Sequence, residues 1–567
     1  MPSSTAFTRR GFVGATAGVA GAIAAMPLLS ACGSAAANKG GVSSSKGLSG
    51  ILPDYVPLTN GPTPDIPAVS GVNGALSDPG FLKYPTNLVK TVSATPGSGG
   101  SYSAIIPLWG NIPNASNAYY QALNKALGTN LTVNPANGNN YNTTLPTLVA
   151  GNKLPDWINI PSWNNGNANT GELTTTRFAD LTPYLSGSNI RKYPNLAAIP
   201  SGGWASAAWE DKIYGFPCWT SGNNFTGLLY YRADIFKSKG IDPSQITSSD
   251  ALYALGAELT SKAAGVYAFD GLWYSIQQMF KAPPNGPGQF VIKNSKVVSA
   301  YDTDEFTAAL AFAYKVAKSG YMHPSAAAGD TNDAKQRFWS GKTLIESDGG
   351  GAWNLADYTS GTGANPAYQR AAFQLFSADG GTPTIALGAS SSMTSYLSKS
   401  LSSSQIEEIL GVANYLAAPF GSYEYTLINY GVEGVDYTMT SNGPSYTKQG
   451  DNEANQAIYQ QLVTPQSAVT NFGAAAVTTA ACAWQANSVK YAYKPTFWNM
   501  NITAPSQYQT AYSMAEIVDI VNQVTYGTKT VSDFTTALSN WKSSGGGQKM
   551  LDWYTSNVYD KYGNGLS

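Results

Sequence analysis

Tryptophan, tyrosine and asparagine give this chain its most distinctive chemistry. The sequence holds 13 Trp and 35 Tyr, and 12% of its residues are aromatic, while only 12% are charged. Flat aromatic rings pack on apolar ligand faces, and neighbouring amides donate and accept hydrogen bonds without adding charge. That combination suits a neutral ligand rich in hydroxyl groups, such as a sugar. Our first candidates for binding are Trp109, Trp163 with the adjacent Asn164, Trp219, Trp273 and Trp353.

Each of these tryptophans has core packing as an alternative role, because Trp is highly buried on average. Trp353 follows the triplet Gly349-Gly350-Gly351. We expect these three residues, which have no side chains, to let a ligand approach the backbone closely. We also expect them to provide little local packing for a Trp in the core. Asp348, Tyr430 and Glu433 are further candidates for hydrogen bonds with ligand hydroxyls. The two carboxylates could instead cap turns, and Tyr430 could be structural.

Few residues suit catalysis or metal binding. The single histidine, His323, and three cysteines exclude four-cysteine and His-rich zinc sites and any mechanism that needs two imidazoles. No Gly-x-Ser-x-Gly elbow accompanies His323. A glycosidase or lyase would need two carboxylates about 5 to 10 Å apart, and no motif selects a pair among Asp156, Asp348, Glu433 and Asp436. We predict a protein without catalytic residues or cofactors, with an exported carbohydrate-active enzyme as the alternative.

The charge composition limits the partners. The sequence has 33 Lys and Arg against 34 Asp and Glu, which gives a net charge of −1. This balance provides no basic field that could bind a phosphate backbone through counterion release. We therefore predict no nucleic-acid partner.

Strand and helix patterns alternate from Tyr102 onward and place two of the tryptophans. The predicted elements are, in order, strand 102–109, helix 116–127, strand 131–133, helix 141–149 and strand 156–160. This order predicts right-handed crossovers and a parallel sheet, whose ligands lie beyond the carboxyl ends of the strands. Trp109 and Trp163 both fall at such ends.

Capping patterns mark two later helices. Asp302 with Glu305, and Ser404 with Glu407, have the spacing of a capping box, and apolar residues follow each pair at helical spacing. From Ala511 to its end the chain is predicted to be mostly helical.

The amino terminus has the pattern of an export signal. Arg9 and Arg10 precede an apolar, Ala- and Gly-rich stretch over 11–29, and the arginine pair resembles the twin-arginine class. The following Leu29-Ser30-Ala31-Cys32 resembles the lipobox of bacterial lipoproteins, whose cysteine is lipidated. A membrane-spanning anchor is the alternative, but Gly, Ala and Thr dilute the stretch. We predict a signal peptide over 1–31 and a lipidated Cys32 that holds the chain on the extracellular face of the cell membrane.

The next segment, 32–100, is predicted to be the lipid anchor and a tether. It is rich in Gly, Ser, Ala and Pro and lacks long apolar runs, so burial would not recover the entropy of ordering it. Its second half contains Phe81, Tyr84 and Leu88. Composition leaves open whether that half lies extended across the folded domain.

Several short segments, taken in order behind the lipobox, resemble one protein family. They are Leu154-Pro155-Asp156, Phe178–Leu185, Asp211–Pro217, Leu229–Phe236, Phe338–Lys342 ahead of Gly351–Trp353, and Asn429–Tyr437. The chain from about 101 to its end is similar to the extracellular solute-binding lipoproteins of ATP-driven (ABC) importers, in the family 1 group that takes mainly sugars and oligosaccharides.

The resemblance implies an α/β fold of the class II periplasmic-binding-protein type. Two lobes, each a sheet flanked by helices, would enclose the ligand cleft, with the chain crossing between them near Ser221 and Gly388. The implied lobes are 101–221 with 389–470, and 222–388 with 471–567. We expect a monomer that captures an oligosaccharide and delivers it to a membrane-embedded ABC permease. Use of the same fold for sensing without transport is the alternative.

Two details qualify the resemblance. Some relatives carry an acidic calcium loop after the motif that contains Arg232, but residues 260–270 lack that ligand set, so we predict no metal there. Cys218 and Cys482 could pair after export, because disulfides persist outside the cell. Their separation in sequence does not decide it.

Overall fold

The computed structural model describes residues 40–43, 48–225, 227–284 and 288–564. The predicted signal peptide, Arg9, Arg10 and Cys32 lie outside the described residues. Within the described part of the chain, no helix is both long enough and apolar enough to span a membrane.

A five-stranded sheet in the order β4-β3-β5-β16-β8 holds the first strands of the chain. Strands β3 (Ser101–Leu108), β4 (Asn130–Asn137) and β5 (Trp157–Pro161) run parallel, which confirms the predicted parallel order. Strand β16 (Ser391–Leu397) lies antiparallel between β5 and β8 (Gly215–Thr220). The sheet is therefore mixed, because it takes in a strand from much later in the chain.

Helices cover both faces of this first sheet. Ile106 of β3 packs with α2 (Ala118–Leu127) and α16 (Ser403–Leu416), while the preceding Ile105 packs with α3 (Tyr141–Ala150) on the opposite face. The alternation follows from the two-residue period of a strand. The predicted helices are confirmed, and α2 ends at Gly128, whose φ of 68° suits a glycine.

A second, four-stranded sheet has the order β10-β13-β9-β14. Strand β9 (Leu228–Arg232) pairs antiparallel with β13 (Thr343–Asp348) and β14 (Arg370–Ala372), and β10 (Tyr267–Phe269) runs parallel to β13. Strand β8 of the first sheet ends at Thr220 and β9 begins at Leu228, so a short segment links the two sheets.

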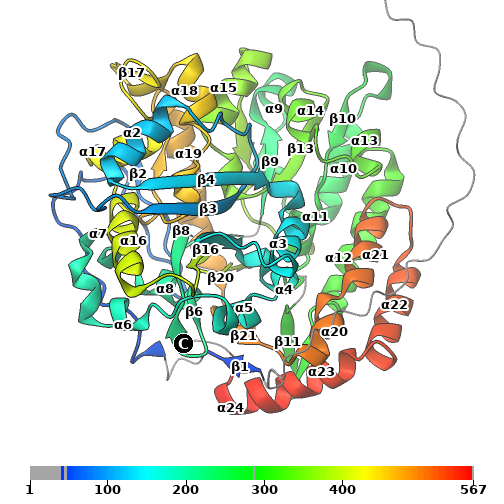
Figure 1. Cartoon of the computed structure of the whole chain (residues 1–567). Helices are drawn as coiled ribbons and strands as arrows, with labels where there is room; N and C mark the ends of the chain where they lie inside the picture. Colours follow the sequence, from blue (N-terminus) through cyan, green and yellow to red (C-terminus); the bar gives the residue numbers. More distant parts are fainter. Residues whose placement is uncertain (1–39, 44–47, 226, 285–287, 565–567) are drawn as a thin grey trace, which may run out of the picture. The chain divides into compact units, whose positions relative to one another are not determined.

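The C-terminal helices belong to the core of the second sheet. Helices α21 (Ala515–Thr525), α22 (Val531–Ser543) and α23 (Gly547–Tyr554) share a hydrophobic cluster with α12 (Asp304–Ser319) and β13. Figure 1 shows them in orange and red beside α12 and at the lower edge. This confirms the predicted helical end of the chain. Other helices used below are α11 (Trp273–Met279), α15 (Leu355–Ala364), α17 (Tyr423–Tyr430) and α19 (Ala475–Ser488).

Both predicted capping boxes were wrong in their register. Helix α12 is capped by Thr303, whose side chain accepts the Phe306 N–H at 3.2 Å, while Asp302 pairs with Lys542 at 2.5 Å. Helix α16 is capped by Ser402 in a capping box with Gln405. At the start of each helix, the sequence contains capping residues at more than one position. The tertiary packing of the apolar face of the helix determines which of them caps it.

The described residues before β3 form little regular structure but make close contacts. Strand β2 (Gly80–Phe81) pairs in parallel with β19 (Val469–Thr470). The ring of Phe81 packs against that of Phe420, with their centroids 4.5 Å apart. The thiols of Cys218 and Cys482, for which pairing was left open, are both free and buried.

Candidate functional site

A cavity of about 1560 Å³ is lined by residues from both sheets. The first sheet contributes residues of β8 and β16 and of the turns after β3 and β5. The second sheet contributes the start of β9, the glycine loop after β13 and helix α11. A third group of lining residues comes from α19 and from the loop 493–502 that follows it.

Trp109 and Trp163 stand side by side in the cavity wall. They follow the neighbouring parallel strands β3 and β5, so their backbones reach the same edge of the sheet. Their ring centroids are 6.0 Å apart and the rings are inclined at 51°. Trp109 is 49% exposed and Trp163 is 56% exposed. Two large rings that remain half exposed on a concave wall are typical of a binding surface.

The position of the Trp109 ring depends on Gly138. A Cβ atom at Gly138 would lie 2.3 Å from Cε2 of the Trp109 ring, closer than any contact that side chains tolerate. The indole can therefore pack directly on the backbone of the short 3₁₀ turn Gly138–Asn140. Only glycine allows this approach, which fixes the ring without burying it.

Trp219 lies in β8 with a strained backbone. Its φ of 57° falls in the left-handed region, which costs a non-glycine residue of order 1 kcal/mol or more. The Trp219 N–H donates to Thr464 Oγ1 at 2.6 Å, which holds this conformation in place. Lys281, Phe497 and Asn499 also line the cavity with positive φ, at 56°, 59° and 57°. Such strain concentrates at binding sites, where the surrounding structure compensates for it.

Trp353 lines the cavity but is largely buried, with 7% of its surface exposed. Its ring meets that of Tyr230 edge-on at 5.7 Å, within a cluster that includes Leu228 and Tyr368. The expectation that the glycine triplet leaves little packing for this Trp was wrong. The packing partners come from β9 and from the chain around β14, which are distant in sequence.

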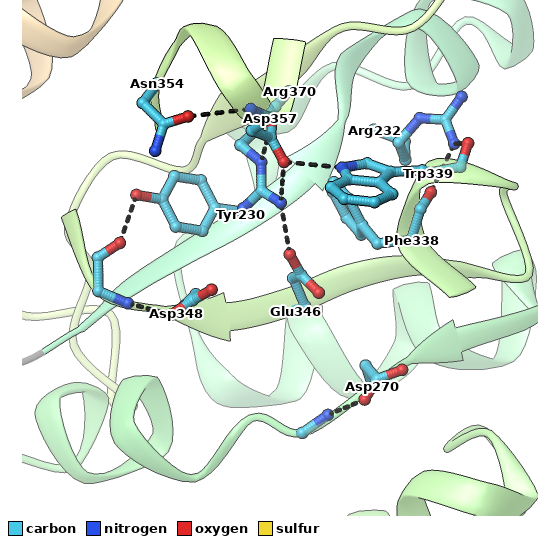
Figure 2. Close-up of polar contacts among 12 residues, drawn as sticks. Tyr230, Arg232, Asp270, Phe338, Trp339, Glu346, Asp348, Asn354, Asp357 and Arg370 are labelled. Carbon is cyan, nitrogen blue, oxygen red and sulfur yellow. Dashed lines mark hydrogen bonds and ion pairs between the residues drawn. The ribbon is translucent and has the colours of Figure 1, made fainter. Parts of the chain in front are cut away.

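A buried ionic cluster lies behind the glycine loop (Figure 2). The Arg370 guanidinium pairs with Glu346 at 2.7 Å and with Asp357 at 2.9 Å. It also lies 4.6 Å from the centre of the Tyr230 ring. The Tyr230 hydroxyl in turn donates to the Gly349 carbonyl at 3.1 Å. Arg370 thus supports the loop through Tyr230.

Asn354 completes the support of the loop. Its side-chain amide donates to the Gly351 carbonyl at 2.7 Å, and its Oδ1 accepts the Asp357 N–H at 2.9 Å, which caps α15. Asp357 is also held by Trp339 Nε1 at 2.8 Å (Figure 2). The loop that faces the cavity is therefore fixed from two sides.

Few charged side chains line the cavity. They are Asp78, Lys281 and Asp519 among the described residues. Burial raises the pKa of Asp78 to about 6, against the opposing effect of hydrogen bonds from Ser221, Asn223 and Gln485. Within the described residues, no group of three or more His, Cys, Asp or Glu side chains could hold a metal ion. The wall is suited to a neutral, hydrogen-bonding ligand.

Comparison with known proteins identifies the family. The model of the family "Bacterial extracellular solute-binding protein" matches residues 109–419, which is more than half of the chain. The chain belongs to this family. No curated protein sequence matches this solute-binding protein.

Solved structures confirm the predicted two-lobe α/β fold. The alginate-binding protein AlgQ2 without calcium ion is 13% identical with a TM-score of 0.59, over 83% of this chain and 100% of its own. The N-glycan transport solute binding protein NgtS from Streptococcus pneumoniae is 16% identical with a TM-score of 0.57, over 82% and 99%. An HMO-binding solute-binding protein from Bifidobacterium longum infantis is 14% identical with a TM-score of 0.59, over 82% and 99%. At these identities the likeness concerns the fold alone.

The solute-binding protein brings four of the predicted side chains together around the cavity: Trp109, Trp163, Trp219 and Trp353. The other five do not line it. Asn164 is buried, and the half-buried Trp273 packs edge-on against Phe306 at 5.5 Å. Asp348 accepts the N–H of the next residue, Gly349, at 2.7 Å. The remaining two are Tyr430, which contacts Tyr84 edge-on at 5.9 Å, and Glu433, which is exposed and forms a β-bridge with Tyr437.

Sequence reasoning missed other lining residues. Tyr274 follows Trp273 and is 56% exposed in the cavity wall. Trp484, Trp498 and Asn499 come from the last hundred residues. The dipeptide Trp498-Asn499 repeats Trp163-Asn164, and this repetition is the sequence signal that could have identified Trp498 and Asn499 as lining residues.

Replacement of Arg370 by Met should destabilise the protein strongly. Two buried carboxylates would lose their partner, and breaking a buried ion pair from one side costs about 3 to 5 kcal/mol. Arg191→Met is the matched control, because Arg191 pairs with Asp54 at the surface, where such pairs contribute about 1 kcal/mol or less. Thermal unfolding measures both. Equal losses in the two variants would contradict the structural role of Arg370.

The stability of the protein should depend on Glu346 between about pH 4.5 and 7. Burial raises the pKa of Glu346 to about 7 even though Arg370 opposes the shift. A carboxyl group whose pKa is raised in the folded state stabilises the fold fully at pH values below its pKa in the unfolded state. This stabilisation is lost as pH rises through the pKa of the folded state. Glu346→Gln should therefore gain stability relative to wild type as pH rises from 4.5 to 8. Unfolding at several pH values tests this, with the exposed Glu258→Gln as the control. A pH-independent difference would refute it.

Proposed function

We propose that this solute-binding protein captures a neutral oligosaccharide in the cavity between its two sheets and delivers it to an ABC importer. The observation that carries the proposal is the pair of half-exposed rings, Trp109 and Trp163, on a wall with few charges. Sugar rings present apolar CH faces that pack on indole. Their hydroxyls need the neutral donors and acceptors that line the rest of the cavity.

The size of the cavity favours an oligosaccharide over a single sugar. Its volume of about 1560 Å³ exceeds the roughly 300 to 1,000 Å³ of common small-molecule sites. Proteins of the same fold are described as binding alginate or HMO or as N-glycan transport proteins. Those descriptions support the substrate class and leave the particular sugar to experiment.

Ligand contacts from both sheets provide a mechanism for delivery. A ligand held by Trp163 on one side and by Tyr274 on the other favours a closed arrangement of the lobes over an open one. It shifts that equilibrium only by its difference in affinity for the two states. We propose lobes of 101–221 with 389–470 and of 222–388 with 471–567, and a closed monomer that docks on the permease.

The proposed role requires no catalytic step. The two carboxylates among the described lining residues are Asp78 and Asp519, and the Asp78 carboxylate is held by the Ser221 hydroxyl. His323 caps a short helix, where its Nδ1 accepts the Ser325 N–H at 3.2 Å.

We further propose that the protein is an exported lipoprotein, anchored through Cys32 after cleavage of a twin-arginine signal peptide over 1–31. The support is the sequence pattern of Arg9, Arg10 and Cys32 together with membership of an extracellular family. Anchoring at the membrane would keep the binding protein close to its permease.

Trp163→Ala should weaken oligosaccharide binding by about thirtyfold or more, as aromatic hot spots do. Because Trp163 is 56% exposed, the melting temperature without ligand should change little. A carbohydrate library screened by thermal shift selects the ligand, and calorimetric titration then measures affinity. Tyr423→Ala, with 60% exposure outside the cavity, is the control. Unaltered affinity in the Trp163 variant would remove this ring from the site, and a library without any binder would contradict the substrate class.

Cys32→Ala should abolish lipidation and release the chain from the membrane. Mass spectrometry of the mature amino terminus in the native host is the measurement. We expect a diacyl or triacyl modification on residue 32 in the wild type. An unmodified mature chain that begins elsewhere would refute the anchor.

A further inference from the structure

The residues 70–84, here called the strap, precede both sheets in the chain and contact the surroundings of both. Ala75 is buried in the cluster of Leu228 and Tyr230 from the second sheet. Phe81 packs with Phe420, in the turn before α17. Helix α17 in turn belongs through Ile428 to the core of the first sheet. The seven residues 75–81 thus bridge two separate hydrophobic clusters.

Backbone hydrogen bonds fix the strap between these clusters. The Leu76 N–H donates to the Gly222 carbonyl at 3.0 Å, in the segment that links β8 to β9. The Val72 N–H donates to the Val489 carbonyl at 3.1 Å, just after α19. At the other end, the Val469 N–H donates to Pro79 O at 2.9 Å. The fit is close, because a Cβ at Gly222 would lie 2.6 Å from Leu76 Cβ.

Asp78 lies between the two ends of the strap, at the cavity wall. Its carboxylate accepts the Ser221 hydroxyl at 2.9 Å, and its backbone N–H donates to Gln485 Oε1 at 2.8 Å. Gln485 Oε1 also accepts from Asn223 Nδ2 at 3.1 Å. All four side chains line the cavity, and they come from the strap, the linking segment and α19.

We propose that the strap is part of the ligand site, and that Asp78 is a positioning residue that fixes the polar wall formed by Ser221, Asn223 and Gln485. The inference rests on the proposed function, because it assigns this wall to the binding of the oligosaccharide. It also gives the segment before the sheets a role in binding, beyond its expected role as a tether.

The chemistry of the cluster agrees with this role. Asp78 is 9% exposed, and a carboxylate is costly to bury unless it is hydrogen-bonded. The titratable side chain that contacts it from α19 is Cys482, whose thiol lies 4.0 Å from the Asp78 carbonyl. Burial raises the pKa of Cys482 to about 11, so this thiol is neutral and does not balance the charge. Ser221 and Gln485 are held in fixed orientations, which preorganises them for ligand hydroxyls.

The test is a double-mutant cycle on the full chain, with the tightest neutral oligosaccharide from the library as the probe. Asp78→Ala should raise Kd by about tenfold, because Ser221 loses the charge-assisted hydrogen bond that orients its hydroxyl. Ser221→Ala should raise Kd less, because the Asp78 carboxylate also accepts from Gln485 Nε2 at 3.5 Å. The double variant should bind no worse than Asp78→Ala, because Ser221 acts through its contact with Asp78. Asp78→Asn keeps the acceptor for Ser221 and should recover most of the affinity.

Asp65→Ala is the matched control. Asp65 precedes the strap and is exposed. Its carboxylate accepts the N–H of Leu82 at 2.8 Å, at the far end of the strap, and neither residue lines the cavity. Its Kd should equal that of the wild type. All titrations are made well below the melting temperature of each variant, so that they compare folded proteins.

The outcomes separate this inference from the proposed function. Wild-type binding with Kd unchanged in Asp78→Ala and Asp78→Asn would overturn the role of Asp78 and leave the proposed function intact. If the wild type binds no carbohydrate, the proposed function fails. Hydrogen exchange of the unliganded protein then tests the strap alone. Faster exchange over 70–79 in Asp78→Ala than in the wild type is expected, and equal exchange would overturn the proposal.

Discussion

The exposure of two large indole rings to water is the constraint that the rest of this structure serves. Burial of Trp109 and Trp163 against other apolar surface would lower the free energy of the folded protein. They stay half exposed because adjacent parallel strands deliver them to one edge and because Gly138 lets the Trp109 ring rest on backbone. The sheet therefore maintains a binding surface that the hydrophobic effect alone would bury.

Other parts of the cavity wall and the support behind it are kept in place at a local energetic cost. Arg370 is buried between two carboxylates, and Trp219, Phe497 and Asn499 hold backbone conformations that most residues avoid. Aromatic packing on Tyr230 and Phe338 offsets part of the cost at Arg370, and Phe497 is buried in the core of the second sheet. A ligand then meets walls that are already ordered, so binding needs little further loss of conformational entropy.

Local patterns in the sequence predicted the elements better than the side chains they present. The alternation of strands and helices from Tyr102 placed Trp109 and Trp163 together, because parallel order follows from chain order. By contrast, Trp273 and Tyr274 are neighbours on one helix, and only tertiary packing decides which of them faces the cavity. Trp353 packs with Tyr230, which lies far earlier in the chain on β9, and with Tyr368, which lies beyond helix α15. The contact of Asp78 with Gln485 spans 407 residues, a separation that no local pattern encodes.

We propose that a neutral oligosaccharide binds between the sheets, on the wall formed by Trp109 and Trp163. The most direct measurement is a crystal structure of the protein with the tightest-binding oligosaccharide of a neutral glycan library. We expect sugar rings packed against Trp109 and Trp163, with hydroxyls bonded to neutral side chains of both sheets. A ligand bound outside this cavity, or one that touches neither indole, would contradict it.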